Sequence, residues 1–421
     1  MNLLKTSVLN GVAVLIKTAT MFILNKILAV YVGPAGYAAI GQFQNFIQMV
    51  TTFAGTAINN GVVKYTAEYY EDERKQQATW KTASTIVLSA SFIFSFFILI
   101  FQKQLSIYIF HTDVYKNIFI WFAIFLPFFT FNALFLAILN GKKEVVRLVT
   151  ANIFGSIFSL IATTILAIKY NLYGALIALS IYQSLAFLVT LFLCYKSTWF
   201  KLNYLFGKID KLIAKKFAAF ALMAFVSVFF GNISQILLRN IVIKEFGLNY
   251  AGYWEAMNRL SNGYLMLAST ILSVYYLPRL AELNSYKLVK KEINLGYCVI
   301  LPIAIICSFF IYIFREDVVN IVFTKNFKPM LELFFWQLIG DIAKIGSWII
   351  SFMMLSKAMT KLFVITETFF ALSILPITYL FISFFGFKGI ALAFFINCLI
   401  YWITCSYFSY MKLNQGAKPH E

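Results

Sequence analysis

The chain has 421 residues, of which 61% are hydrophobic, 19% are aromatic and only 12% are charged. So little charge cannot cover the surface of a water-soluble particle of this size, which excludes a soluble enzyme or binding protein. The net charge of +18 does not indicate a nucleic-acid partner, because most of it lies in short loops such as that of Lys142, Lys143 and Arg147. Membrane topology and anionic headgroups explain such loops better.

Twelve membrane-spanning helices are predicted, because apolar runs recur at the length needed to cross roughly 30 Å of hydrocarbon. The first long run is too long for one span, and Gly33, Pro34 and Gly36 supply the turn that divides it. The predicted spans lie at residues 7–31, 36–62, 80–101, 117–139, 148–168, 172–194, 216–241, 251–277, 293–314, 331–355, 362–384 and 389–411.

Lys and Arg residues concentrate in the two tails and in the loops after even-numbered spans. Cytoplasmic loops retain positive charge, so both termini are predicted to be cytoplasmic. The first apolar segment contains Lys17 and Lys26 and continues beyond the length of a signal peptide, which argues against a cleavable signal. All five cysteines fall within predicted spans and form no CxxC pair, so neither disulfides, metal ligands nor cofactors are expected.

The chain also resembles a duplication. Residues 35–37 and 251–253 both read AGY, and each triplet follows a glycine-containing turn and opens a span rich in polar residues. A long basic connection lies at mid-chain, from Lys196 to Lys216. We therefore predict an all-α membrane protein of two six-helix lobes, residues 1–205 and 206–421. Six spans per lobe give both lobes the same orientation and a pseudo-two-fold axis along the membrane normal.

Five cations lie at membrane depth: Lys17, Lys26, Arg239, Arg259 and Lys344. A cation in hydrocarbon costs several kcal/mol unless it faces a polar interior, which makes each of them a functional candidate. Lys17, Lys26, Arg239 and Arg259 are the predicted ligands of an anionic substrate. Because Lys17 and Lys26 are nine residues apart, an ideal helix places them on opposite faces. Lys17 shares its side with Asn10, whereas Lys26 lies on an apolar side where snorkelling is an alternative.

Polar stripes follow the predicted second, seventh and eighth spans. In the second span they fall within an arc of about 100° if the helix is ideal. Such faces suit a polyhydroxylated ligand or water; the alternative is that they form hydrogen bonds between helices of the bundle. With Asn10 of the first span, the predicted cavity-lining residues are Gln42, Asn45, Thr52, Asn59, Gln235 and Asn262.

Three acidic residues also lie at membrane depth. Glu255 and Arg259 are spaced i, i+4, and Asp341 and Lys344 are spaced i, i+3, as in intrahelical ion pairs. Glu367 has no partner in its own span, so it either meets Lys344 from another helix or serves in proton coupling. The structural pairing is favoured, and coupling to protons or sodium through Glu255, Asp341 or Glu367 is the alternative.

Three motifs resemble those of Wzx-type flippases, which belong to the multidrug/oligosaccharidyl-lipid/polysaccharide (MOP) exporter superfamily. They are residues 32–37 (VGPAGY), 60–69 (NGVVKYTAEY) and 336–344 (WQLIGDIAK), and the similarity extends over the whole chain. The branch with O-antigen translocases and the lipid III flippase of enterobacterial common antigen is the most similar. In related lipid II flippases the first-helix cation lies close before the glycine-containing turn, which matches Lys26 better than Lys17.

The resemblance implies a MATE-like fold and a protein that is not an enzyme. It implies movement of an undecaprenyl-diphosphate-linked oligosaccharide from the cytoplasmic to the periplasmic leaflet of the bacterial inner membrane by alternating access. A polysaccharide polymerase and a chain-length regulator are the implied partners. Drug exporters of the superfamily would want a carboxylate in the first helix, where this chain has lysines.

Other functions remain as alternatives. A multidrug or ion exporter of the same superfamily would depend on acidic cavity residues. A membrane polymerase or ligase would need chemistry in an outer loop. The loops near 102–116 and 315–330 are short, and the residues in them that could supply it are His111, Asp113, Arg315, Glu316 and Asp317. No GxxxxGK[ST] sequence is present, so a P-loop does not supply the energy.

Overall fold

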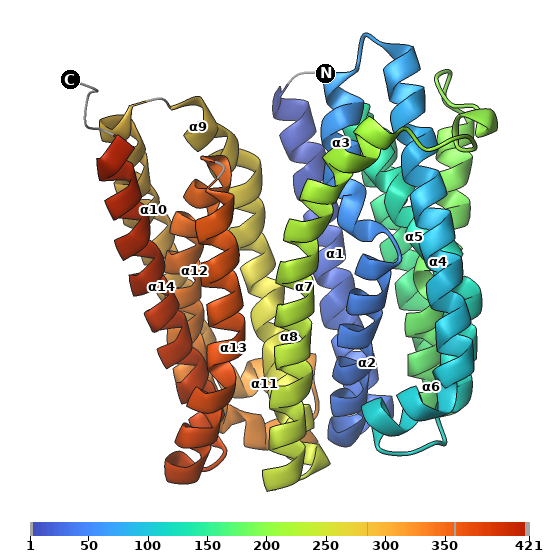
Figure 1. Ribbon diagram of the computed structural model, residues 1–421. Helices are drawn as coiled ribbons and strands as arrows, with labels where there is room; N and C mark the ends of the chain where they lie inside the picture. Colours follow the sequence, from blue (N-terminus) through green and yellow to red (C-terminus); the bar gives the residue numbers. More distant parts are fainter. Residues whose placement is uncertain (1–2, 284, 358, 417–421) are drawn as a thin grey trace. The chain divides into compact units, whose positions relative to one another are not determined.

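The computed structural model describes residues 3–283, 285–357 and 359–416, and every regular element in these ranges is helical (Figure 1). Contacts divide the chain into two units, Met1–Asn232 and Ile233–Glu421, with the division inside helix α7. The predicted lobe boundary at 205/206 lies before that helix and stays a prediction.

The first unit contains α1 (Leu3–Tyr31), α2 (Gly33–Phe53), the short 3-10 helix η1 (Thr56–Ile58), α3 (Asn59–Glu68), α4 (Glu73–Phe110), α5 (Lys116–Gly141), α6 (Val145–Tyr195), η2 (Leu202–Tyr204) and the start of α7 (Lys211–Phe246). The second unit contains the rest of α7, α8 (Leu248–Ile271), the π-helical turn η3 (Leu272–Tyr276), α9 (Leu277–Glu282), α10 (Tyr286–Ile313), α11 (Arg315–Val322), η4 (Lys325–Leu333), α12 (Phe334–Ser356), α13 (Thr360–Phe385) and α14 (Lys388–Gly416).

Within the described residues, nine helices are long and apolar enough to cross a membrane. The helix α6, of 51 residues, counts as one of them but covers two predicted spans, and its backbone turns at Asn171, where φ is 49° and ψ is −129°. The polar helices α2 and α8 are not among the nine. An all-helical membrane protein is thus confirmed, whereas the count of twelve spans and the side of the termini stay predictions.

The predicted second span, 36–62, is not one continuous helix. The helix α2 ends at Phe53, and Gly55 takes φ of +127° before η1 and α3 continue the chain. A Cβ at Gly55 would lie 2.7 Å from Cγ2 of Val87, so both the backbone angle and the close approach of α4 require glycine. The prediction of one continuous helix over residues 36–62 was therefore wrong, and the single polar face from Gln42 to Asn59, which assumed ideal helix geometry throughout, stays a prediction.

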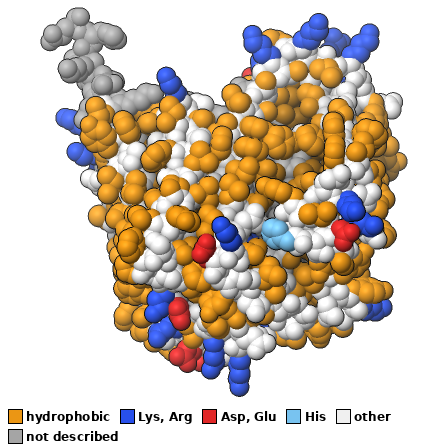
Figure 2. Space-filling view, turned by 60° about the horizontal axis from the view of Figure 1, so that its bottom comes forward, with side chains coloured by type: hydrophobic (Ala, Val, Ile, Leu, Met, Phe, Trp, Pro, Cys, Tyr) orange, Lys and Arg blue, Asp and Glu red, His pale blue; other side chains and the backbone are white. Residues whose placement is uncertain are grey.

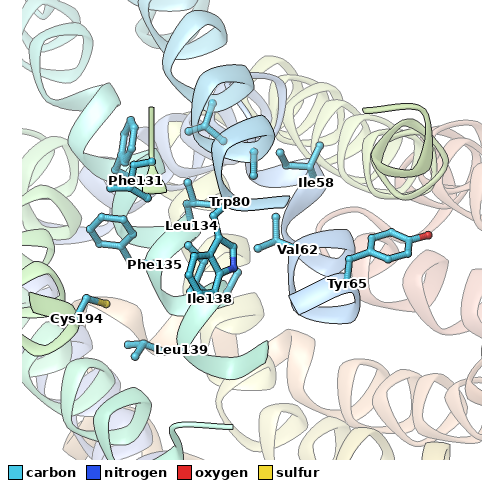
Figure 3. Packing of buried hydrophobic residues seen from close by; sticks show 14 of the residues in the cluster. Ile58, Val62, Tyr65, Trp80, Phe131, Leu134, Phe135, Ile138, Leu139 and Cys194 are labelled. Atoms are coloured by element: carbon cyan, nitrogen blue, oxygen red, sulfur yellow. The ribbon is translucent and has the colours of Figure 1, made fainter. Parts of the chain in front are cut away.

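The core of the first unit is aromatic and lies between α3, α4 and α5 (Figure 3). Trp80, only 2% exposed, packs there beside Val62 and Ile138. Its indole Nε1 donates to Oγ1 of Thr66 over 3.0 Å, which satisfies the one polar group of the buried ring. This packing fixes α4 against α3 without any charged residue in the core.

In the second unit, α12 packs closely against α14. A Cβ at Gly340 would lie 2.6 Å from Cδ1 of Phe394, and a Cβ at Gly346 would lie 2.6 Å from Cζ2 of Trp402. Small residues at such positions allow the aromatic side chains of one helix to reach the backbone of the other, as is typical of helix packing in membranes. The register of α12 that results points Gln337 and Asp341 into the unit, where both are about 1% exposed.

Candidate functional site

The two units differ in the charges that they carry at membrane depth. All acidic residues of the first unit lie near helix ends, at 68, 71–73, 113, 144 and 210, so its spans contain Lys17 and Lys26 without a carboxylate. The second unit contains Glu255, Asp341 and Glu367 together with Arg239, Arg259 and Lys344. Formally, the first unit therefore has an excess of two positive charges within its spans, and the second has none.

Lys17 and Lys26 both lie on α1, which runs as one helix from Leu3 to Tyr31. Their spacing of nine residues turns the helix by about two and a half turns, so the side chains leave it on opposite sides. Lys17 is exposed and Lys26 is half-buried, and in the described part of the chain no carboxylate lies within 4 Å of Lys17. The side chain of Asn10, predicted beside Lys17, lies outside the described residues.

The polar side chains of the first unit are divided by the break at Gly55. Gln42 is 2% exposed, and Thr52 donates to its own helix, to the backbone oxygen of Gln48 over 2.7 Å. By contrast, Nδ2 of Asn45 and Oδ1 of Asn59 are buried and have no hydrogen-bond partner within the described part of the protein. Buried amide groups usually form hydrogen bonds. A ligand or a water molecule would therefore be the expected hydrogen-bond partner of these two atoms.

A compact ion cluster joins α7 to α8 in the second unit. Glu255 is its centre: Nη2 of Arg239 donates to Oε2 over 2.5 Å, and Nε of Arg259 donates to Oε1 over 2.9 Å. The side chains of Arg239, Glu255 and Arg259 are 2%, 8% and 13% exposed. Two guanidinium groups on one carboxylate leave a formal charge of +1, while each cation has a counter-ion as buried charge requires.

Asp341 of α12 is held by neutral groups. Oγ of Ser261 donates to its Oδ2 over 2.7 Å, the hydroxyl of Tyr264 donates to the same oxygen, and Nε2 of Gln337 donates to Oδ1 over 3.3 Å. Among the described residues no ion pair within 4 Å joins Asp341 to Lys344. The predicted intrahelical pair is thus absent, because α8 supplies donors to the carboxylate first.

Glu367 of α13 also binds hydroxyl groups. The hydroxyl of Tyr401 donates to its Oε1 over 2.5 Å, and Oγ of Ser351 lies 3.4 Å from the same oxygen. Lys344 instead lies over aromatic rings, with Nζ 5.4 Å from the ring centroid of Trp348 and 5.7 Å from that of Phe394. The structure therefore does not bring Glu367 and Lys344 into the predicted pair.

The remaining predicted residues lie at intermediate or open positions: Gln235 is half-buried and Asn262 is exposed. Sequence reasoning missed Ser261, Tyr264 and Tyr401, which hold the acids. A signal was present, since Ser261 and Tyr264 are three residues apart on one side of α8, and Gln337 and Asp341 are four apart on α12. What the spacing could not show is that these two sides meet.

Comparisons with known proteins identify a family and a fold. The sequence profile of the family described as polysaccharide biosynthesis protein matches residues 3–284. Proteins called lipid III flippase in Escherichia coli (strain K12) and Shigella flexneri are each 24% identical over 405 residues, which is 96% of this chain and 97% of theirs. In structure, the chain is similar to the inward-facing conformation of a multidrug resistance MATE family transporter of the MOP superfamily, with a TM-score of 0.76, 16% identity and coverage of 96% of both chains.

The structural likeness shows a shared fold, which bears out the predicted MATE-like architecture. The family profile covers the first unit from residue 3 onward and continues through the ion cluster of α7 and α8. The chain therefore belongs to the polysaccharide biosynthesis protein family.

Proposed function

We propose that this protein is a flippase, not an enzyme, that moves an undecaprenyl-diphosphate-linked oligosaccharide from the cytoplasmic to the periplasmic leaflet of the bacterial inner membrane by alternating access. The observation that supports it most is the similarity over 96% of the chain to proteins called lipid III flippase. The substrate would be lipid III or an O-antigen repeat unit, with a polymerase and a chain-length regulator as later partners of the pathway.

The proposal includes twelve spans with both termini cytoplasmic. The helix α6 counts as two spans because its backbone turns at Asn171. The polar helices α2 and α8 are the other two additions, since helices that line a path for glycan need hydrogen-bonding side chains and so lose hydropathy. These additions bring the nine apolar helices of the described residues to twelve.

On grounds of charge, the lysines of α1 are the first candidates to bind the diphosphate. Lys17 is exposed and has no carboxylate in its unit at membrane depth, so an anionic substrate would be its counter-ion. Lys26, half-buried on the opposite side of α1, is the second candidate. Arg259 and Arg239 would contribute the single formal charge of their cluster, with the more deeply buried Arg239 mainly holding Glu255 in place.

The glycan would meet amide and hydroxyl groups. Asn45 and Asn59 have buried polar atoms without a hydrogen-bond partner among the described residues, so sugar hydroxyls would satisfy them. Thr52, in contrast, already bonds to its own helix. We therefore expect the two asparagines to affect glycan selectivity more than Thr52 does.

The membrane potential would drive the movement. An anion that leaves a negative interior gains about 2.3 kcal/mol per charge per 100 mV, so a doubly charged diphosphate gains roughly 4–5 kcal/mol if its charge crosses the whole field. Coupling to protons or sodium through Asp341 or Glu367 is the alternative, because Asp341 is buried, Glu367 is half-buried, and neither has a cation within 4 Å in the described part of the chain.

A multidrug exporter is the second candidate because the fold is shared with a MATE transporter. It would need acidic residues to bind cationic drugs, yet the first unit has none within its spans and those of the second unit already hold partners. A polymerase or ligase has no supporting observation beyond the lipid that it would share.

The test is leaflet exchange of a fluorescent undecaprenyl-diphosphate-linked glycan in proteoliposomes. We expect exchange with the wild type, strongly reduced exchange with Lys17→Gln, and normal exchange with the matched control Lys169→Gln, which removes an exposed cation from α6. Absence of exchange in folded, correctly oriented wild-type protein would contradict the proposed function. Resistance to cationic drugs without glycan-lipid exchange would favour the exporter.

A further inference from the structure

A pocket of about 380 Å³ lies at one end of the second unit, apart from the buried acids. It is formed where α10 ends, α11 and η4 cross the end of the helices, and α12 and α14 begin. Its volume is at the small end of the roughly 300–1,000 Å³ typical of ligand pockets. The topology predicted from the sequence puts this end on the periplasmic side of the membrane.

Aromatic rings form one wall of this pocket. Phe335 and Trp336 follow one another at the start of α12, with ring centroids 5.0 Å apart and planes at 79°. Trp336 stacks on Phe395 at 5.8 Å, and Phe335 lies edge-on to Tyr312 at 5.8 Å. The rings are thus held in fixed orientations by their neighbours, while Phe335 is still 45% exposed.

Charged side chains form the rest of the pocket, with two cations, Arg315 and Lys388, and two acids, Glu316 and Glu332. Within the described residues no ion pair of 4 Å or less joins any of these four. Arg315 is nevertheless fixed, because Nη1 donates to the backbone oxygen of Tyr312 over 2.8 Å and the guanidinium lies 4.5 Å from the centroid of the Tyr312 ring. Figure 2 shows acidic and basic side chains beside one another on this face, within a largely hydrophobic surface.

The combination of aromatic rings with two cations and two acids indicates which class of ligand the pocket would bind. Two positive and two negative groups sum to zero, so the pocket does not favour a diphosphate. Carboxylates accept hydrogen bonds from hydroxyls, guanidinium and ammonium groups donate to them, and a flat ring face packs against apolar C–H groups. A neutral pyranose ring offers all three: hydroxyls that donate, oxygens that accept and an apolar ring face.

We propose that this pocket binds a neutral pyranose ring of the transported glycan when it reaches the periplasmic side. Trp336 and Phe335 contact the ring face, Glu332 and Glu316 accept from its hydroxyls, and Arg315 and Lys388 donate to its oxygens. The identification of the sugar as part of the cargo rests on the proposed flippase function. The pocket would then bind the sugar end of the substrate while the diphosphate binds outside the pocket. Because it contacts the sugar directly, it would discriminate between glycans.

The test uses purified full-length protein and soluble probes, so that it does not depend on transport. Saturation-transfer NMR would be recorded with methyl β-glucopyranoside and methyl β-N-acetylglucosaminide, with methyl β-glucuronide as an acidic sugar and inorganic pyrophosphate as a competitor. We expect transfer to the ring C–H protons of at least one neutral glycoside, and a several-fold loss of that signal in Trp336→Leu and Arg315→Gln. Pyrophosphate should not compete.

Two matched controls distinguish the pocket from the rest of the surface. Trp121→Leu removes a tryptophan that is 44% exposed on α5 of the other unit, and Lys325→Gln removes an exposed lysine of η4 that does not line the pocket. Both should retain the wild-type signal. Lys388→Gln, a surface change, should lose part of it even if Trp336→Leu does not fold.

The inference is overturned if no glycoside gives a signal, if all variants give the same signal, or if only the glucuronide binds and pyrophosphate displaces it. Its failure is distinguishable from failure of the proposed function. Leaflet exchange without glycoside binding would contradict the proposed sugar site but not the flippase function. Glycoside binding that depends on Trp336, without any leaflet exchange, would contradict the flippase function but not the sugar site.

Discussion

Within its spans, the first unit carries Lys17 and Lys26 and no acidic residue, whereas the second carries three acids and three bases. In the second unit Glu255 binds two arginines, and Asp341 and Glu367 are held by hydroxyl and amide donors. Burying charge is costly, and internal partners reduce the cost. Lys17 has no carboxylate within 4 Å in the described part of the chain and no acidic residue in the spans of its unit, so we assign the anion first to α1.

The sharpest test of the second unit is Glu255→Gln. It removes the carboxylate that both Arg239 and Arg259 bind, so the two guanidinium groups lose this shared counter-ion. We expect a loss of about 3–5 kcal/mol in the free energy of unfolding, as is typical when one partner of a buried ion pair is removed. Equilibrium unfolding of the wild type and the variant in detergent would measure this loss. Adding Arg239→Met should recover part of the loss, and a Glu255→Gln protein as stable as the wild type would show that the cluster is not structural.

For the first unit the expectation is the opposite: Lys17→Gln should impair substrate binding and leave stability unchanged. A charge-assisted contact contributes about 1.5–3 kcal/mol, so affinity for the diphosphate lipid should fall roughly 10- to 150-fold. Binding to the purified protein gives the affinity, and Lys17→Arg, which keeps the charge, should retain most of it. If Lys17→Gln destabilises the fold instead, the lysine has an internal role and the contrast between the units fails.

Asp341→Asn tests whether the buried acids drive transport. The amide keeps the shape of the side chain but weakens the hydrogen bonds from Ser261 and Tyr264, which should cost about 1–2 kcal/mol of stability. Because the proposal makes the membrane potential the driving force, leaflet exchange should persist and should not gain or lose a dependence on pH. Abolished exchange in a folded variant would instead indicate coupling through this carboxylate.

The smallest effect is expected for Lys344→Met. No carboxylate lies within 4 Å of Lys344 in the described part of the chain, and its ammonium group approaches the rings of Trp348 and Phe394. Removing such contacts should cost about 0.5–2 kcal/mol, partly offset because methionine is easier to bury. Thermal unfolding measures the change, and a loss as large as that of Glu255→Gln would show that Lys344 does have a buried counter-ion.

These contrasts also show what a sequence can predict for such a protein. Composition and apolar runs predicted the all-helical membrane class, because span length depends on bilayer thickness alone. The spacing of Glu255 and Arg259 predicted a contact that lies within one helix, and the structure has it at 2.9 Å. The same reasoning was wrong for Asp341 and Lys344, because Ser261 and Tyr264 reach the carboxylate from another helix.

The continuous helix of the predicted second span was wrong for a different reason. Its residues were placed on an ideal helix, but the positive φ of Gly55 turns the chain between Thr52 and Asn59. A glycine in an apolar run shows that such a turn is allowed, not that it occurs. The close approach of Val87 from α4 leaves no room for a side chain at Gly55, and that contact is tertiary.

The most direct measurement of the central claim compares charge removal in the two units in one assay. The affinity of purified protein for undecaprenyl diphosphate would be measured for the wild type, for Lys17→Gln with Lys26→Gln, and for Lys344→Gln as the matched loss of a cation from the second unit. We predict a large loss of affinity for the pair in α1 and wild-type affinity for Lys344→Gln. Equal affinity in all three proteins, or a loss confined to Lys344→Gln, would contradict the account.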